Sequence, residues 1–290
     1  MLQSVKEKFS IVGSIWAMTF RMLRRYPVII IPFLIIASLD AIVLILGYLA
    51  PRPPLSSILA PPIRALFNYP FGSTAGGEAF LHYPVNFLLL PRLLYIGQVV
   101  IGATVGVVMT AVAVRMVSQA NEGVSPSWGI NLRDAIFRYF TLLIFWVIVF
   151  LLGAVASREL PKLVSTPLLK QLLYYLSLGI VILVETFFAY GVAAIMLENQ
   201  RTWRAIVRTF SIAKSTFLPT LILVFSPLIF QIFFALIQGK IPQLMMKFFP
   251  EITLFVLGLS ILVTFITDCI LRTSTVILFL VKRDTEKATD

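Results

Sequence analysis

The feature that most constrains this chain is a series of six apolar stretches, each about as long as a membrane-spanning helix. A helix needs about 20 mostly apolar residues to cross the hydrocarbon core of a bilayer. The stretches cover residues 27–50, 93–117, 139–157, 172–197, 217–237 and 252–281. Since 59% of the 290 residues are hydrophobic and only 13% are charged, a soluble fold would have too few polar side chains to cover its surface. We therefore predict an all-α integral membrane protein with six transmembrane helices.

The distribution of basic residues predicts the orientation, because cytoplasmic loops of membrane proteins carry an excess of lysine and arginine. The N-terminal segment, the second and fourth connections and the C-terminal end together hold 16 of the 24 basic residues, and the other connections hold 8. We therefore expect a plasma (inner) membrane protein with both termini in the cytoplasm. The formal net charge of +11 then reflects basic residues that face anionic lipids on the cytoplasmic side of the membrane. Nucleic-acid binding is the poorer explanation, because the basic residues are divided among loops.

The counts of cysteine and histidine exclude several kinds of site. The chain has one cysteine, Cys269, and one histidine, His82. These numbers exclude a disulfide framework, a zinc site of cysteines and histidines, and an iron–sulfur cluster. We predict no catalytic, cofactor-binding or metal-binding residue, no cofactor and no enzymatic activity.

Segments ahead of the first, third and fifth spans have the pattern of amphipathic helices. Residues 4–25, 127–138 and 201–215 place apolar and polar side chains on different faces at helical spacing. Such helices lie in the headgroup region of a membrane with their polar face toward water. In the middle segment the polar stripe is Ser127, Asn131, Asp134 and Arg138, and the apolar stripe is Leu132, Ile136 and Phe140.

Each of these segments contains a tryptophan followed five residues later by an arginine. The pairs are Trp16 with Arg21, Trp128 with Arg133 and Trp203 with Arg208. All six are candidate contacts to lipid headgroups, because tryptophan favours the membrane interface and arginine reaches toward water. The spacing indicates three repeat units, each an interfacial helix followed by a transmembrane hairpin. The alternative is that unrelated interfacial helices share these residue types.

The domain organisation follows from this repeat. We expect residues 1–290 to form a single polytopic membrane domain with repeat units at 1–117, 118–197 and 198–281 and a cytoplasmic tail at 282–290. The first unit contains one long outer loop, residues 51–92, with eight prolines and many apolar residues. We expect this loop to form short helices on the outer surface, or to bind a protein partner or a second copy of the chain.

One run resembles a known membrane domain. It extends from Glu198 to Lys214 and consists of an acidic residue followed by a basic helix that enters the fifth span. It is similar to the polytopic membrane domain associated with glycerophosphodiester phosphodiesterases and to the stand-alone relatives of that domain. The resemblance extends to the six-span layout, although Thr209 stands where serine is more usual. The soluble phosphodiesterase domain and its His/Glu/Asp metal set are not in this sequence. The resemblance therefore implies a fold and no catalytic residue.

Four ionisable residues within the apolar stretches form a candidate intramembrane polar site: Asp40, Glu185, Asp268 and Arg272. A charge at the bilayer centre costs at least about 2.5–3.5 kcal/mol, so each of them needs a partner, a proton or water. Asp268 and Arg272 lie four residues apart on one helix and can pair. Glu185 has no opposite charge on its own helix. It is either a structural group bonded to a neighbouring helix, or a proton or substrate site.

These observations leave three functions open. The first is a non-enzymatic scaffold or accessory subunit of a membrane complex that binds lipid or a protein partner. The second is a transporter or permease that uses the acidic residues within the membrane, because internal repeats are frequent in transporters. The third is a membrane-embedded lipid-processing enzyme, which would need a convergent set of reactive groups.

The basic-residue asymmetry gives the first testable prediction: both termini face the cytoplasm. Cysteines introduced at Ser4 and Thr289 should resist a membrane-impermeant thiol reagent in intact cells, whereas cysteines at residues 73–77 should react. Labelling of either terminus from outside would reject the orientation.

Overall fold

The structure, a computed structural model, describes residues 2–68, 82–158 and 166–289. Every regular element within these ranges is a helix, and six helical stretches are long and apolar enough to cross a membrane. The predicted all-helical, six-span class is confirmed at this level. The spans are Pro27–Leu49, Val85–Asn121, Tyr139–Ser157, Tyr175–Leu197, Phe217–Gln238 and Ile252–Ala288.

Each span consists of one helix or of two helical segments in succession. The first combines a 3₁₀ turn, η1 (Pro27–Ile30), with α2 (Ile31–Leu49). The second joins α5 (Val85–Ile101) and α6 (Val107–Asn121) through a π-helical turn, η2 (Gly102–Gly106). The others are α8 (Tyr139–Arg158), α9 (Pro167–Phe188) with α10 (Gly191–Leu197), α12 (Phe217–Gln238) and α14 (Ile252–Thr289).

The three segments predicted as amphipathic are helices: α1 (Leu2–Arg25), α7 (Trp128–Phe137) and α11 (Thr202–Ser215). Each is joined to the span that follows by very little chain. Arg138 alone separates α7 from α8, and Thr216 alone separates α11 from α12. These short joints keep α7 and α11 at the points where their spans begin.

The chain divides into two compact units, which are described separately. Unit 1 consists of Met1–Leu34, Ala103–Ile229 and Thr267–Asp290, and unit 2 of Ile35–Gly102 and Phe230–Ile266. The boundaries fall inside α2, η2, α12 and α14 rather than at the ends of the three predicted repeat units. All three of α1, α7 and α11 belong to unit 1.

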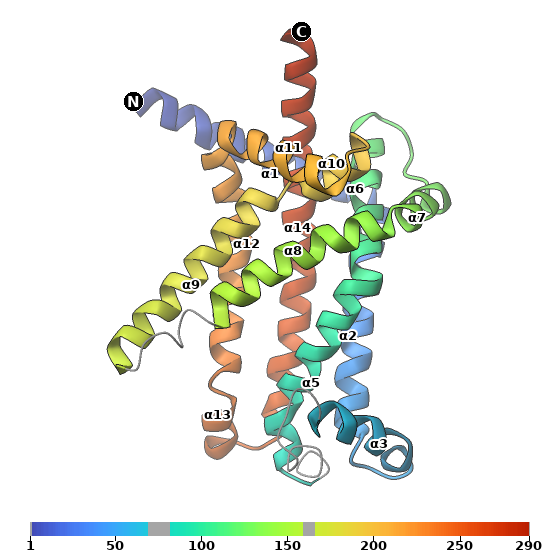
Figure 1. The fold of residues 1–290 in the computed structure, drawn as a ribbon, viewed down its shortest axis with the longest axis vertical. Coiled ribbons are helices and arrows are strands. Elements are labelled where there is room, and N and C mark those ends of the chain that lie inside the picture. Colours follow the sequence, from blue (N-terminus) through green and yellow to red (C-terminus); the bar gives the residue numbers. More distant parts are fainter. Residues whose placement is uncertain (1, 69–81, 159–165, 290) are drawn as a thin grey trace. The chain divides into compact units, whose positions relative to one another are not determined.

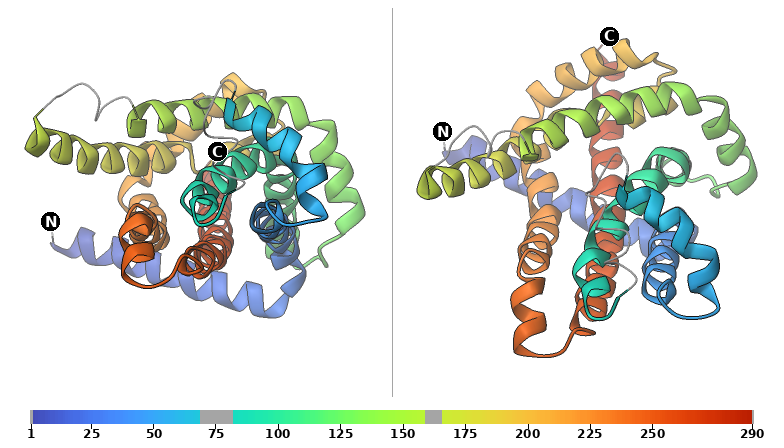
Figure 2. Two further views of the ribbon diagram at one scale, coloured as in Figure 1. Left: turned by 90° about the horizontal axis from the view of Figure 1, so that it is seen from below. Right: turned by 60° about the horizontal axis from the view of Figure 1, so that its bottom comes forward.

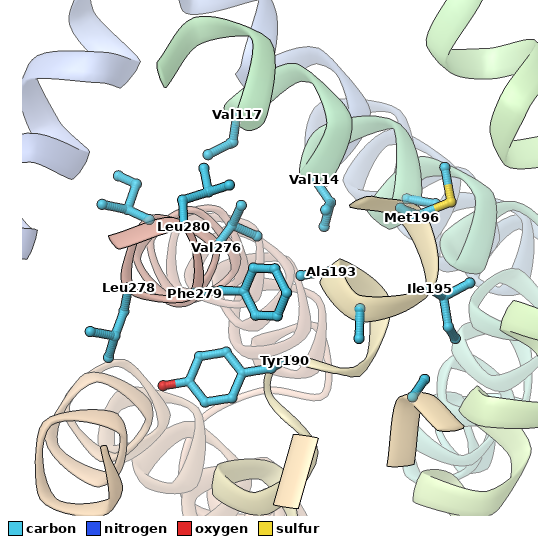
Figure 3. Packing of buried hydrophobic residues seen from close by; sticks show 14 of the residues in the cluster. Val114, Val117, Tyr190, Ala193, Ile195, Met196, Val276, Leu278, Phe279 and Leu280 are labelled. Atoms are coloured by element: carbon cyan, nitrogen blue, oxygen red, sulfur yellow. The ribbon is translucent and has the colours of Figure 1, made fainter. Parts of the chain in front are cut away.

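The core of unit 1 forms where α6, α10 and α14 meet. Val114 and Val117 of α6, Ala193 of α10, and Val276 and Phe279 of α14 are all buried. Figure 3 shows the rings of Tyr190 and Phe279 facing each other among these side chains, with centroids 6.1 Å apart. Apolar packing of this kind orders three helices that are far apart in sequence.

The remaining helices of unit 1 lie around this core. The helices α8 and α9 run side by side in opposite directions, as Figures 1 and 2 both show. The helices α1 and α11 run across the direction of the C-terminal part of α14 rather than along it (Figure 1).

Unit 2 is held together by a second apolar cluster in which α2 and α5 approach closely. Leu44, Leu90 and Leu94 pack there with Leu257 of α14 and with Ile241, which opens the short helix α13 (Ile241–Lys247). Gly97 makes the close approach feasible, because a Cβ atom at this position would lie 2.6 Å from Val43 Cγ1. Small residues at contacts between membrane helices have this role in general.

The predicted outer loop, residues 51–92, is partly helical. The helix α3 (Leu55–Asn68) follows α2, as expected for a loop with short helices, while residues 69–81 lie outside the described ranges. The second span was expected to begin at residue 93, and this was wrong: α5 begins at Val85 and includes Pro91. Proline marks a helix end only when no neighbouring contact holds the chain helical, and Leu90, Leu93 and Leu94 are buried on both sides of it.

The fourth span is interrupted, which the apolar pattern did not predict. The chain leaves the helix at Ala189 and Tyr190 and resumes it at Gly191. Tyr190 is fully buried. Its hydroxyl group shares hydrogen bonds with Thr220 of α12 and with Thr216, the residue that precedes α12. These tertiary contacts outweigh the local preference for a continuous helix.

Gly191 provides the second prediction. A Cβ atom built there would lie 1.8 Å from Phe145 Cζ, and the Phe145 side chain is itself buried. Gly191→Ala should therefore lower the free energy of unfolding by about 1–3 kcal/mol through overpacking, measured by thermal unfolding in detergent. Gly179→Ala in α9 is the control, because no atom lies within 4 Å of its Cβ position. It should be neutral or stabilising by up to about 1 kcal/mol. Equal effects of the two changes would contradict the close contact.

Candidate functional site

The short helix α11 has three distinct sides. One side is buried against unit 1 and consists of small and aliphatic residues: Ala205, Ile206, Thr209, Ile212 and Ala213. A second side is apolar and largely exposed, with Trp203 at 74% and Val207 at 56%, while Phe210, at 38%, packs its ring against Phe187 and Phe188 of α9. The third side is polar and carries Arg204 and Ser211.

Arg208 fastens α11 to two other helices of unit 1. Its Nε atom donates to Glu198 Oε2 at 3.1 Å, at the end of α10, and its Nη2 atom donates to Glu286 Oε2 at 2.6 Å, on α14. Lys282 Nζ lies 3.8 Å from the other oxygen of Glu286. Burial lowers the pKa of Arg208, but the hydrogen bonds to the two carboxylates raise it by more, so the guanidinium stays charged. Arg208, predicted as a headgroup contact, thus has its charge compensated within the protein.

The helix α7 is oriented in the opposite way to the prediction. We expected its polar stripe to face water, but Asn131 is fully buried and Asp134 Oδ2 lies 2.8 Å from Arg115 Nη2 on α6. Asn131 also exchanges a reciprocal pair of amide hydrogen bonds with Gln119, at 2.8 and 3.2 Å. The polar stripe faces the protein because these partners on α6 satisfy it.

The outward side of α7 is mainly apolar, with Arg133 as its one charged residue. Phe137 is 91% exposed, and Ile130 and Ile136 are 62% and 58% exposed. Phe140, at the start of α8, continues this uncovered surface at 76%. In water such a surface is unfavourable by about 25 cal/mol per Å².

Arg138, the joint between α7 and α8, binds the end of α10. Its Nη1 atom donates to the carbonyl oxygen of Ile195 at 2.6 Å, and its Nη2 atom donates to Asn199 Oδ1. A cation at a helix C-terminus satisfies carbonyl groups that have no partner within the helix. Asn199 has a φ of 57°, a left-handed conformation that asparagine tolerates better than most residues. This turn directs the chain from α10 into α11.

The other predicted headgroup contacts divide into two groups. Arg21 on α1 and Arg133 on α7 are exposed and available to ligands. Trp16 and Trp128 instead pack against the core of unit 1, so that only Trp203 stands clear of the protein. The helix α1 nevertheless carries an uncovered apolar surface, with Phe9 at 56% and Phe20 at 53% exposure. Its buried side consists of Val12, Ile15 and Thr19.

The structure brings two of the four intramembrane ionisable residues together across helices. Arg272 Nη2 on α14 lies 3.7 Å from Glu185 Oε2 on α9, and both side chains are more than a quarter exposed. The distance is that of an ion pair without a hydrogen bond. Asp268 lies one helical turn before Arg272 on α14. Asp40 is buried in unit 2 and is therefore not placed relative to the other three.

Several residues of these sites were not predicted, and their partners explain why. Asp134 and Arg138 were read as a water-facing stripe, since the sequence does not indicate which face of α7 meets α6. Glu286 was assigned to a tail, although α14 continues through it to Thr289. The sequence offered one signal for these contacts, an acidic residue ahead of a basic helix. This signal singled out Glu198 but did not show that Arg208 is its partner.

Within the described ranges, no group of three histidine, cysteine, aspartate or glutamate side chains could hold a metal ion. Compared with protein-family models, with curated protein sequences and with solved structures, the chain has no match.

The Glu185–Arg272 pair gives the third prediction. Glu185→Gln keeps the shape of the side chain and should cost no more than about 1–2 kcal/mol of stability in detergent if the pair is structural. Arg272→Gln breaks the same pair and serves as the matched comparison. In a double-mutant cycle, the two changes together should cost less than the sum of the single changes. Strict additivity would show that the two groups do not interact.

Proposed function

We propose that this chain is a non-enzymatic integral membrane protein that acts as a scaffold or accessory subunit of a membrane complex. In this proposal α1, α7 and α11 lie in the cytoplasmic interface of the plasma (inner) membrane and provide its binding surfaces for lipid or for a protein partner. The protein has both termini in the cytoplasm and an organisation of three helical hairpins.

The observation that carries the proposal is the reversed polarity of α7. Its polar residues Asn131 and Asp134 bind α6, while Ile136 and Phe137 point away from the protein. Polar groups are satisfied inside and apolar groups are left outside, which is favourable where the surroundings are lipid rather than water. The joint of one residue to α8 supports a location at the membrane surface.

The fourth prediction tests this location. A nitroxide attached to Phe137→Cys in nanodiscs should be more accessible to oxygen, which concentrates in lipid, than to a water-soluble nickel complex. Ser125→Cys, an exposed position in the connection between α6 and α7, is the control and should show the reverse order. Protection of position 137 from both reagents would indicate a protein partner or second copy. Equal access of the nickel complex to both positions would overturn the proposal.

A transporter is the second candidate, and the Glu185–Arg272 pair favours it. An ion pair that is more than a quarter exposed within the spans is unfavourable in lipid and suits a site that water or substrate reaches. Liposomes loaded with a pH-sensitive dye decide between the two functions. A scaffold predicts the same proton leak as empty liposomes for the native protein and for Glu185→Gln. Proton flux in the native protein that the folded Glu185→Gln variant lacks would place transport first. The lipid-processing enzyme remains the third candidate.

A further inference from the structure

We propose that α11 is a recognition site for anionic phospholipid headgroups. This inference rests on the proposed function and makes it more specific, because it names the lipid class and the helix that reads it. The occupant is the headgroup layer of the bilayer that α12 crosses.

The first argument is the charge on the free sides of α11. Arg201, Arg204 and Lys214 are all exposed, and the segment from Thr202 to Ser215 contains no acidic residue. Within the part of the chain that the structure describes, Arg208 is the one cation of this segment with a carboxylate partner. Arg208 therefore holds the helix in place, and three other positive charges remain for an external anion.

The second argument is the position of these charges beside an apolar surface. Trp203, Val207 and Phe210 follow one another at helical spacings of four and three residues. Trp203 and Val207 are exposed, and the partly exposed ring of Phe210 packs against Phe187 and Phe188 of α9. Lys214 continues the same side one turn beyond Phe210, and Arg204 begins the adjoining polar side. An amphipathic helix with an aromatic stripe and flanking cations inserts its rings among the upper acyl chains and leaves its cations at phosphate level.

The third argument separates lipid from a soluble partner. Thr216 is the entire connection between α11 and the membrane span α12. The apolar stripe thus lies next to the point where the chain enters the membrane, and the nearest apolar surroundings are the lipid. A basic residue close to an anionic surface contributes about 1 kcal/mol, which corresponds to about a five-fold preference.

Quenching of Trp203 fluorescence by lipids with brominated acyl chains tests the inference. The full-length protein is reconstituted with equal amounts of phosphatidylglycerol and phosphatidylcholine, and either one or the other lipid carries the bromines. The difference between the native protein and Trp203→Phe isolates this residue among the four tryptophans of the chain. We expect brominated phosphatidylglycerol to quench Trp203 at least about five-fold more effectively, with a preference that declines as salt screens the charges.

The variant Arg201→Gln/Arg204→Gln/Lys214→Gln should reduce this preference to about one without abolishing the quenching, because Trp203 stays among the acyl chains. The control Arg52→Gln/Lys240→Gln/Lys247→Gln removes as many positive charges from unit 2 and should keep the preference. Equal quenching by the two lipids in the native protein would overturn the inference but leave the proposed function intact. Quenching by neither lipid would overturn both. Should the triple variant fail to fold, the lipid preference of the native protein and its salt dependence still decide.

Discussion

The attachment of α11 to α10 and α14 in unit 1 depends on the guanidinium of Arg208 and its two carboxylate partners. Glu198 closes α10, Glu286 lies near the end of α14, and Arg208 bridges them from α11. An arginine contacts two acidic groups in fixed directions because its planar donors are rigidly spaced, which a lysine could not reproduce. Lys282, 3.8 Å from Glu286, supplies a second cation, so that two positive and two negative charges compensate one another where three helices meet.

A common rule governs α7 and α11 in spite of their different compositions. In both helices polar groups with partners on other helices face the protein: Asn131 and Asp134 in one, Arg208 in the other. The large apolar side chains that remain outside, such as Phe137 and Trp203, need no partner of defined geometry. A fluid lipid environment meets that requirement, whereas it could not satisfy an amide or a carboxylate.

The parts of this structure that follow from short-range pattern were predictable from the sequence. Span length and helical spacing are local, so the six spans and the helices at 4–25, 127–138 and 201–215 were identified. The side on which each helix meets the protein was not predictable. Asp134 depends on Arg115 of a preceding helix, and Arg208 depends on Glu286, 78 residues further along the chain. The interruption at Tyr190 likewise arises from contacts with Thr216 and Thr220. The resemblance of residues 198–214 to a phosphodiesterase-associated membrane domain stays a prediction.

The connection through Thr216 has a consequence for how this protein can vary. A helix turns by about 100° with each residue, so one residue inserted between α11 and α12 would shift the rotational phase of the first helix against the second. Either α11 would lose the contacts of Arg208 with Glu198 and Glu286, or α12 would begin with a different face toward its neighbours. No side chain would have been changed. The length of this joint is therefore specified as strictly as the identity of any residue near it.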